Sequence, residues 1–137
     1  MAELTDVEDL AVALIRTTGI ADSDLKTLIS NRINPPTNPK LKGKFPLINL
    51  QIIGGVNIVR NENAMDATML VFATASSSSK EAKEVYNAFK AIFHPCRFED
   101  DAVSIVLEES EKPVSFAQKE QELHVWRGRW RIKAFKK

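Results

Sequence analysis

The segment with the clearest chemical potential is basic and aromatic and spans residues 119–135, KEQELHVWRGRWRIKAF. Tryptophans beside arginines are typical of nucleic-acid binding, in which rings stack on bases and guanidinium groups bind phosphates. In a β-strand, however, alternate residues lie on opposite faces, so the rings and the cations separate. We expect the tryptophans to pack in the core. For the cations three roles stay open: ion pairs between strands or subunits, contact with DNA in a channel, and plain solvation. The apolar and the basic residues that alternate are Trp126, Trp130, Ile132 and Ala134, and Arg127, Arg129, Arg131 and Lys133.

A second basic group lies in residues 32–46, RINPPTNPKLKGKFP, which hold four of the six prolines. Such a composition predicts an extended loop. Loops of this length in compact domains usually bind a partner or are disordered. Lys40, Lys42 and Lys44 would meet an acidic neighbour or nucleic acid, and a flexible, solvated loop is the alternative.

The remaining polar groups do not form a catalytic or metal-binding pattern. Phosphate-binding, dinucleotide-binding, zinc-protease and nucleophile-elbow motifs do not occur. The serines at 76–79 suit a helix start better than a nucleophile, because no base is placed beside them. His94 and His124 are far apart in sequence, and Cys96 is the only cysteine. The acidic triplet at 99–101 fits a solvated loop better than a cation site. We expect no enzymatic activity, no cofactor and no bound metal.

A helix over residues 77–93 is the element that must position the final strand. Its apolar residues recur at helical spacing, Ser78 and Glu81 have the spacing of a capping box, and Pro95 ends the helix. The apolar positions are Ala82, Val85, Tyr86, Phe89, Ile92 and Phe93.

A second helix is expected near the N-terminus. Thr5 and Glu8 form another capping-box spacing, and Gly19 is a plausible C-terminal stop. A short helical piece follows, capped by Asp22 or Ser23.

The strands are predicted from alternation and β-branched content at 47–53, 67–75, 103–111 and 119–135. Residues 94–102 are expected to form a loop, and Pro113 to end or bulge the third strand. If that strand pairs with the last one, Glu108, Glu109 and Glu111 lie across from the arginines. The predicted fold class is α+β, a mostly antiparallel sheet of four or slightly more strands packed against two helices, with a long Pro/Lys-rich loop.

The composition, 44% hydrophobic and 27% charged over 137 residues, fits one domain over 1–137 around a single core. The acidic N-terminus is unlike a secretory signal, so the protein is expected to be cytoplasmic. Net charge is +1 but alternates along the chain, with −4 over 1–31, +4 over 32–44, −4 over 45–118 and +5 over 119–137. Such blocks suit a protein that meets copies of itself or several partners, although solvated faces would also account for them.

The order of these elements resembles the tail terminator, or tail completion, proteins of long-tailed bacteriophages. The residues that carry the resemblance are SNRINPP, then FPLINLQIIGG, then MLVFATASSSSKEAKEVYNAFKAIF, and last ELHVWRGRWRIKAF. The resemblance spans nearly the whole chain and rests on pattern and order, without a catalytic fingerprint.

This resemblance implies a virion protein of the tail or neck, assembled in the host cytoplasm. Such a subunit forms a homo-oligomeric ring, a hexamer, on the tail tube protein, ends tube growth and joins the tail to the head connector or head completion protein. DNA would pass through its channel, and no membrane is involved. We assign the inter-subunit or channel contacts to the basic residues Lys40, Lys42, Lys44, Arg127, Arg129, Arg131 and Lys133. The alternatives are another neck or baseplate subunit and a small nucleic-acid-binding module that uses the basic last strand.

Overall fold

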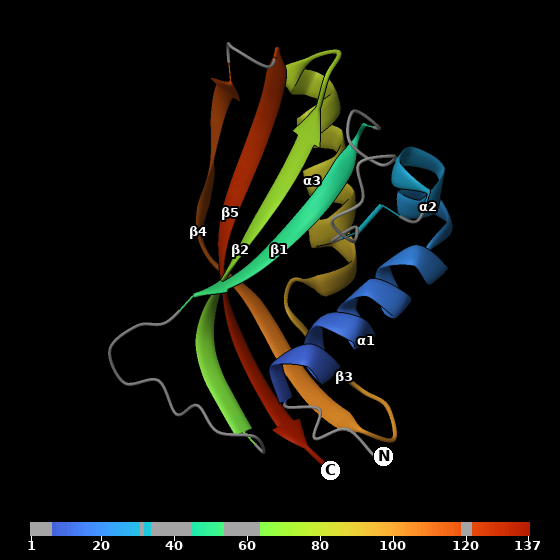
Figure 1. Cartoon of the computed structure of the whole chain (residues 1–137), viewed down its shortest axis with the longest axis vertical. Coiled ribbons are helices and arrows are strands. Elements are labelled where there is room, and N and C mark those ends of the chain that lie inside the picture. Colours follow the sequence, from blue (N-terminus) through green and yellow to red (C-terminus); the bar gives the residue numbers. More distant parts are fainter. Residues whose placement is uncertain (1–6, 31, 34–44, 54–63, 119–121) are drawn as a thin grey trace.

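The computed structural model describes residues 7–30, 32–33, 45–53, 64–118 and 122–137 (Figure 1). Three helices and five strands follow one another along the chain. They are α1 (Val7–Ala21), α2 (Ser23–Ile29), β1 (Leu47–Ile53), β2 (Ala64–Ala75), α3 (Ser79–Phe93), β3 (Cys96–Glu99), β4 (Val103–Gln118) and β5 (Leu123–Lys136).

The strands form one antiparallel sheet in the order β1-β2-β5-β4-β3. The three helices lie on the same side of this sheet, and α3 is seen behind β2 and β1 in Figure 1. The predicted α+β class is confirmed, with a sheet one strand larger than four. β5 is the central strand although it is the last one in the chain.

Helix α3 begins where the capping box predicted. The Glu81 N–H donates to the Ser78 hydroxyl oxygen at 3.1 Å, which satisfies an amide of the first turn. The helix ends at His94, the residue before Pro95, as expected from proline's effect on its predecessor. Its buried residues are Ala82, Val85, Tyr86, Phe89 and Phe93.

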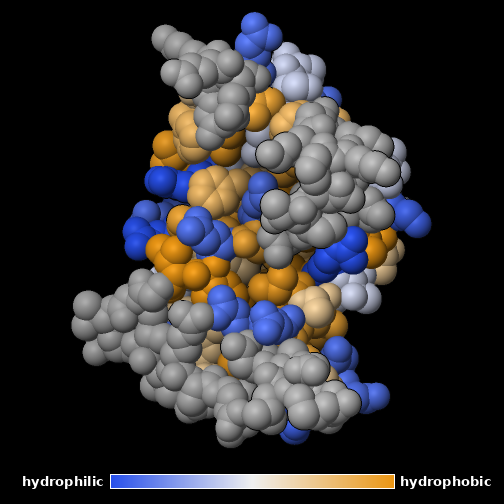
Figure 2. Space-filling model, viewed as in Figure 1, coloured by the Kyte–Doolittle hydropathy of each residue, from blue (hydrophilic) through white to orange (hydrophobic). Residues whose placement is uncertain are grey.

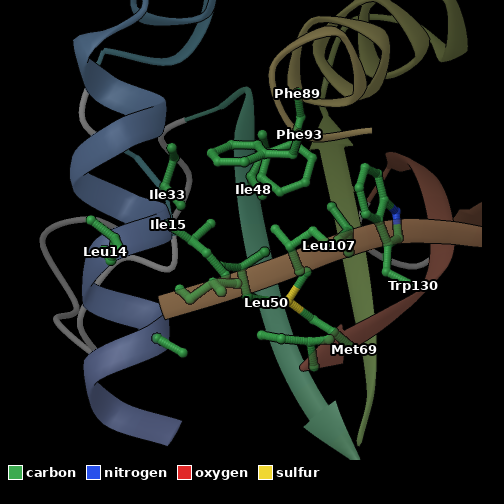
Figure 3. Packing of buried hydrophobic residues seen from close by; sticks show 14 of the residues in the cluster. Leu14, Ile15, Ile33, Ile48, Leu50, Met69, Phe89, Phe93, Leu107 and Trp130 are labelled. Atoms are coloured by element: carbon green, nitrogen blue, oxygen red, sulfur yellow. The ribbon is translucent and has the colours of Figure 1, made fainter. Parts of the chain in front are cut away.

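The core fills the space between the helices and the sheet (Figure 3). Phe89 of α3 packs edge-on against Trp130 of β5, with ring centroids 5.4 Å apart. Ile15 extends from α1 into the same core and is also buried. Burying such large side chains contributes about 1.5–3 kcal/mol each. Trp126 is only half-buried, and its indole N–H donates to the Ser79 carbonyl oxygen at 3.0 Å. Both tryptophans therefore lie on the helix side of β5, as predicted.

The predicted end of the first helix at Gly19 is wrong, because α1 continues to Ala21. Gly19 serves close packing instead, since a Cβ there would lie 2.5 Å from the Ile33 Cδ1 atom. The next helix starts at once, because the Asp22 carboxylate accepts the Leu25 N–H at 3.0 Å. Thr5 lies outside the described residues.

The predicted loop over 94–102 is also wrong, because it contains β3, which pairs with Ser104–Leu107 of β4. The turn between β3 and β4 is closed by Asp100, whose carboxylate accepts the N–H groups of Ala102 and Val103 at 2.8 and 2.9 Å. The acidic triplet at 99–101 thus belongs to a turn. β4 passes Pro113 with two register shifts and reaches Gln118, so the proline bulges the strand and does not end it.

Of the predicted loop over 32–46, the structure describes only the two ends. Ile33 forms an isolated parallel bridge with Ile48, and the Ile48 N–H donates to the Arg32 carbonyl oxygen at 2.9 Å. The start of the segment is therefore attached to the edge of β1. Lys40, Lys42 and Lys44 lie outside the described residues.

Candidate interaction surface

The side of the sheet opposite the helices carries a row of cations along β5. Because alternate residues of a strand point to opposite faces, Gly128 and Trp130 are buried on the helix side, while their neighbours in sequence face away. The predicted separation of rings and cations is confirmed. We call the helix-free side the basic face, defined by Arg127, Arg129, Arg131 and Lys133.

Within this row Arg131 is engaged by its own subunit. Its Nε and Nη2 atoms donate to the two carboxylate oxygens of Asp66 on β2, at 3.3 and 3.0 Å. This hydrogen bonding, together with the charges of Arg131 and Lys133, lowers the pKa of Asp66 below its ordinary value. Both side chains are well exposed, so the pair contributes little to stability. Arg131 is less available to a partner than its neighbours.

Of the three glutamates expected across from the arginines, two lie on the basic face. Glu108 is the register partner of Arg131, and Glu111 is the register partner of Arg129. Neither glutamate forms an ion pair with these arginines among the residues that the structure describes. Glu109, predicted beside them, pairs in register with Trp130 and therefore lies on the helix side. That part of the prediction is wrong, because alternation places Glu109 with Leu107.

Arg127 and Arg129 have no hydrogen-bond or ion-pair partner for their side chains in the described part of the chain. They border a hollow of about 220 Å³ on the basic face. Its other lining residues are the apolar Ile53, Leu70 and Val114 and the charged Glu111 and Lys112. The hollow therefore offers a partner guanidinium groups without a described partner, one further cation, one carboxylate and some apolar surface.

Apolar side chains are also exposed around this row. Val114, Phe116 and Phe135 are 51%, 38% and 53% exposed, and their register partners place them on the basic face. Figure 2 shows the resulting mixture, with orange apolar surface between blue charged side chains in the centre of the view. Exposed apolar side chains interleaved with cations are typical of a contact surface.

The helix side of the same strands contains a polar network that sequence reasoning missed. The Tyr86 hydroxyl donates to the Glu109 carboxylate and accepts the Trp130 indole N–H at 3.0 Å. Lys90 Nζ lies 3.0 Å from the other oxygen of Glu109, and the Glu109 N–H donates to His94 Nδ1 at 2.8 Å. One turn of α3 is thereby tied to β4 and β5. The signal was present, because Glu109 continues the alternation of Ile105 and Leu107.

Burial, reinforced by the hydrogen bond to Glu109, raises the pKa of Tyr86 well above its ordinary value. The hydroxyl fits only because β5 has a glycine beneath it. A Cβ at Gly128 would lie 1.8 Å from the Tyr86 hydroxyl oxygen and 2.4 Å from its Cζ atom. The network therefore acts as a structural link between the two layers.

The other candidate groups from the sequence are placed as follows. Ser78 caps α3, as expected, and His124 lies in β5 between Ala75 and Ala117. Among the described side chains, no three histidine, cysteine, aspartate or glutamate residues are grouped as a metal site would require. No helix in the described ranges is both long enough and apolar enough to cross a membrane.

Among the comparisons with known proteins, the one with solved structures gives a match. No protein-family model matches the chain, and no curated protein matches it in sequence. A solved structure does match, a chain of the "Virion of native gene transfer agent (GTA) particle", with a TM-score of 0.69 and 12% sequence identity. The match covers 91% of this chain and 98% of that chain. At this identity the likeness shows that the two chains share a fold over nearly their whole lengths.

Proposed function

We propose that this protein is a structural component of a virion and, more specifically, a tail terminator. The observation that carries the proposal is the fold shared end to end with a chain from a gene transfer agent virion. Because the match leaves little of either chain uncovered, the likeness involves the whole subunit. The order of elements, which resembles tail terminator proteins, adds the finer assignment. In this role the chain needs no enzymatic activity and no cofactor, and it works as one domain over 1–137.

In the proposed assembly, copies of the chain form a hexameric ring on the end of the tail tube. The ring stops tube growth and presents its other side to the head connector or head completion protein. The basic face supplies contacts between subunits or with DNA in the channel. Arg127 and Arg129 are the strongest candidates because their side chains have no partner in the part of the chain that the structure describes, and Lys133 adds charge to the row. We extend the same role to Lys40, Lys42 and Lys44, which are outside the described residues.

Electron microscopy of the purified protein and of particles tests this proposal. We expect rings of six subunits and, with a gold-labelled antibody, one label position where the tail meets the head. A protein that stays monomeric in solution and is absent from purified particles would refute the proposal. A label at the far end of the tail or along its length would instead favour a baseplate subunit or another neck subunit.

A second candidate function is nucleic-acid binding by the isolated subunit, and it is favoured by Arg127 and Arg129, whose side chains have no partner within the described ranges. Binding of this kind weakens steeply with salt, because each phosphate contact releases a counterion. We expect the double variant Arg127→Ala/Arg129→Ala to bind DNA with a smaller salt dependence, by the amount that corresponds to about two lost phosphate contacts. Arg131→Ala is the matched control, because Arg131 is engaged by Asp66. Binding that is absent, or unaffected by salt, removes this candidate.

A further inference from the structure

The two margins of the sheet are each covered only in part. At one margin β3 pairs with Ser104–Leu107, and no described residue pairs with the outer edge of β4 from there to Gln118. In Figure 1 the upper part of β4 forms the left margin of the sheet. At the other margin Ile33 bridges Ile48, and beyond it no described residue pairs with the outer edge of β1. Unpaired strand edges bind other strands readily.

The open edge of β4 is protected along its first part and unprotected along its second part. Residues 108–113 carry charges, two register shifts and Pro113, all of which block strand addition. The Glu109 N–H is also occupied, by His94. Residues 114–118, VSFAQ, contain no charge and no proline, and Val114 and Phe116 are exposed. The open part of β1, residues 50–53, has the uncharged sequence LQII.

The strand directions let one margin pair with the other. Every neighbouring pair in the sheet is antiparallel, so β1 runs parallel to β5, and β4 runs opposite to both. When copies are related by rotation about an axis roughly along the strands, β4 of one copy therefore meets β1 of the next as an antiparallel pair, which has favourable hydrogen-bond geometry. A contact between two different surfaces of a subunit is heterologous, and heterologous contacts form a ring when the rotation from one copy to the next closes.

We infer that the outer edge of β4 over Val114–Gln118 binds the outer edge of β1 over Leu50–Ile53 in a second copy of this chain. This inference rests on the proposed ring and names its interface. The two edges lie at different heights along the strands. Through Thr74 and Val125 the register places Phe116 level with Leu47, and therefore not level with residues 50–53. Their pairing requires the strands to tilt relative to the ring axis, as strands do in closed sheets. One face of the joined sheets then lines the channel. The basic face is available for this, because the helices cover the other face.

Disulfide trapping tests the contact directly in assembled rings. Opposite residues of an antiparallel pair have Cα atoms about 4.5–5.5 Å apart, within the range of a disulfide. With Cys96 replaced by Ala, Phe116→Cys is combined in turn with Asn49→Cys, Gln51→Cys and Ile53→Cys, all on the helix-free side. We expect one of these registers to give a ladder of cross-linked multimers under oxidation. Each single-cysteine variant should give none, because the two edges differ.

Two lysine variants test the same edge without cross-linking. We expect Phe116→Lys to abolish rings while leaving the subunit folded, because a lysine on an open edge opposes strand addition. Phe135→Lys is the matched control, since Phe135 is equally apolar, exposed and on the same face, but belongs to the central strand. We expect its rings to persist.

The outcomes separate this inference from the proposed function. Rings that form normally with Phe116→Lys, and that give no ladder in any of the three registers, overturn the edge contact and leave the tail terminator intact. Cross-linked dimers from Phe116→Cys alone would show β4 pairing with β4 and also overturn it. A wild-type protein that forms no ring, in solution or on tubes, overturns both.

Discussion

The two faces of β5 use the same strand for different purposes. On the helix side the side chains are enclosed, and the polar atoms of Trp130, Tyr86 and Glu109 are partners of one another. On the basic face Arg131 is paired with Asp66, whereas the side chains of Arg127 and Arg129 have no partner among the described residues. Satisfied polar groups in a tight interior specify one fold. Exposed cations without a partner among the described residues are suited to contact with another molecule. We therefore expect substitutions on the first face to change folding and substitutions on the second to change assembly.

The largest expected effect is on the helix side. Trp130→Ala should lower the free energy of unfolding by about 3–5 kcal/mol, because it removes a fully buried ring that packs against Phe89. Urea denaturation followed by far-ultraviolet circular dichroism measures this change. Trp126→Ala is the control and should lower the free energy of unfolding less, because Trp126 is only half-buried. Equal losses for the two variants would contradict this difference between the tryptophans.

Gly128→Ala should have the next largest effect. We expect overpacking to lower the free energy of unfolding by about 1–3 kcal/mol. The new methyl group would overlap the hydroxyl and ring of Tyr86, which are held between Trp130 and Glu109. Gly19→Ala provides a matched control, because the only close approach of its methyl group would be to the far end of the Ile33 side chain, while Leu25 and Phe93 would lie at ordinary contact distances. Thermal unfolding of both variants gives the comparison. A Gly128→Ala protein as stable as wild type would show that Tyr86 is not confined.

The raised pKa of Tyr86 predicts a pH effect on stability. Because the folded state holds the phenol proton more tightly than the unfolded state, stability is unchanged up to the ordinary tyrosine pKa of 10.0. Above that pH it should fall by up to about 1.4 kcal/mol per pH unit. Tyr86 is the only tyrosine, so absorbance at 295 nm reports it alone.

For this titration the urea-unfolded protein is the reference and should ionise at its ordinary pH. In the folded protein we expect no phenolate signal until the protein unfolds. A phenolate signal near pH 10 without loss of circular dichroism would contradict the enclosed network.

The smallest expected effect is on the basic face. Arg127→Ala and Arg129→Ala should leave the urea midpoint unchanged within error, because both side chains are exposed and unpaired. Arg131→Ala should cause at most a slight loss, since its partner Asp66 is also solvent-accessible. A marked loss of stability from Arg127→Ala would mean that this face takes part in folding, and the comparison would fail.

Much of this arrangement could be predicted from periodicity. The alternation in β5 separated the tryptophans from the cations, and the helical spacing with Ser78 and Glu81 predicted α3 and its start. Both signals are local, because each depends on residues that are neighbours in one element.

The errors arose where the signal was short or non-local. β3 has four residues, too few for a pattern. Pro113 left two outcomes open, an end or a bulge, and the register of β4 shows the bulge. Glu109 was grouped with its acidic neighbours, although its place in the alternation put it beside the core. The pairing of Arg131 with Asp66 joins residues 65 positions apart, and strand register of this kind has no signature in a single sequence.

The position of β5 in the sheet has a consequence for the order of folding. β1 with β2, and β3 with β4, are hairpin neighbours that can associate early, but the two pairs meet only through β5. Until β5 has been synthesised, the inner edges of β2 and β4 are unsatisfied. Closing the sheet then depends on contacts far apart in sequence, which form slowly and leave apolar surface open to aggregation in the meantime. The strand that joins the two hairpins is thus the last of these five strands to be synthesised.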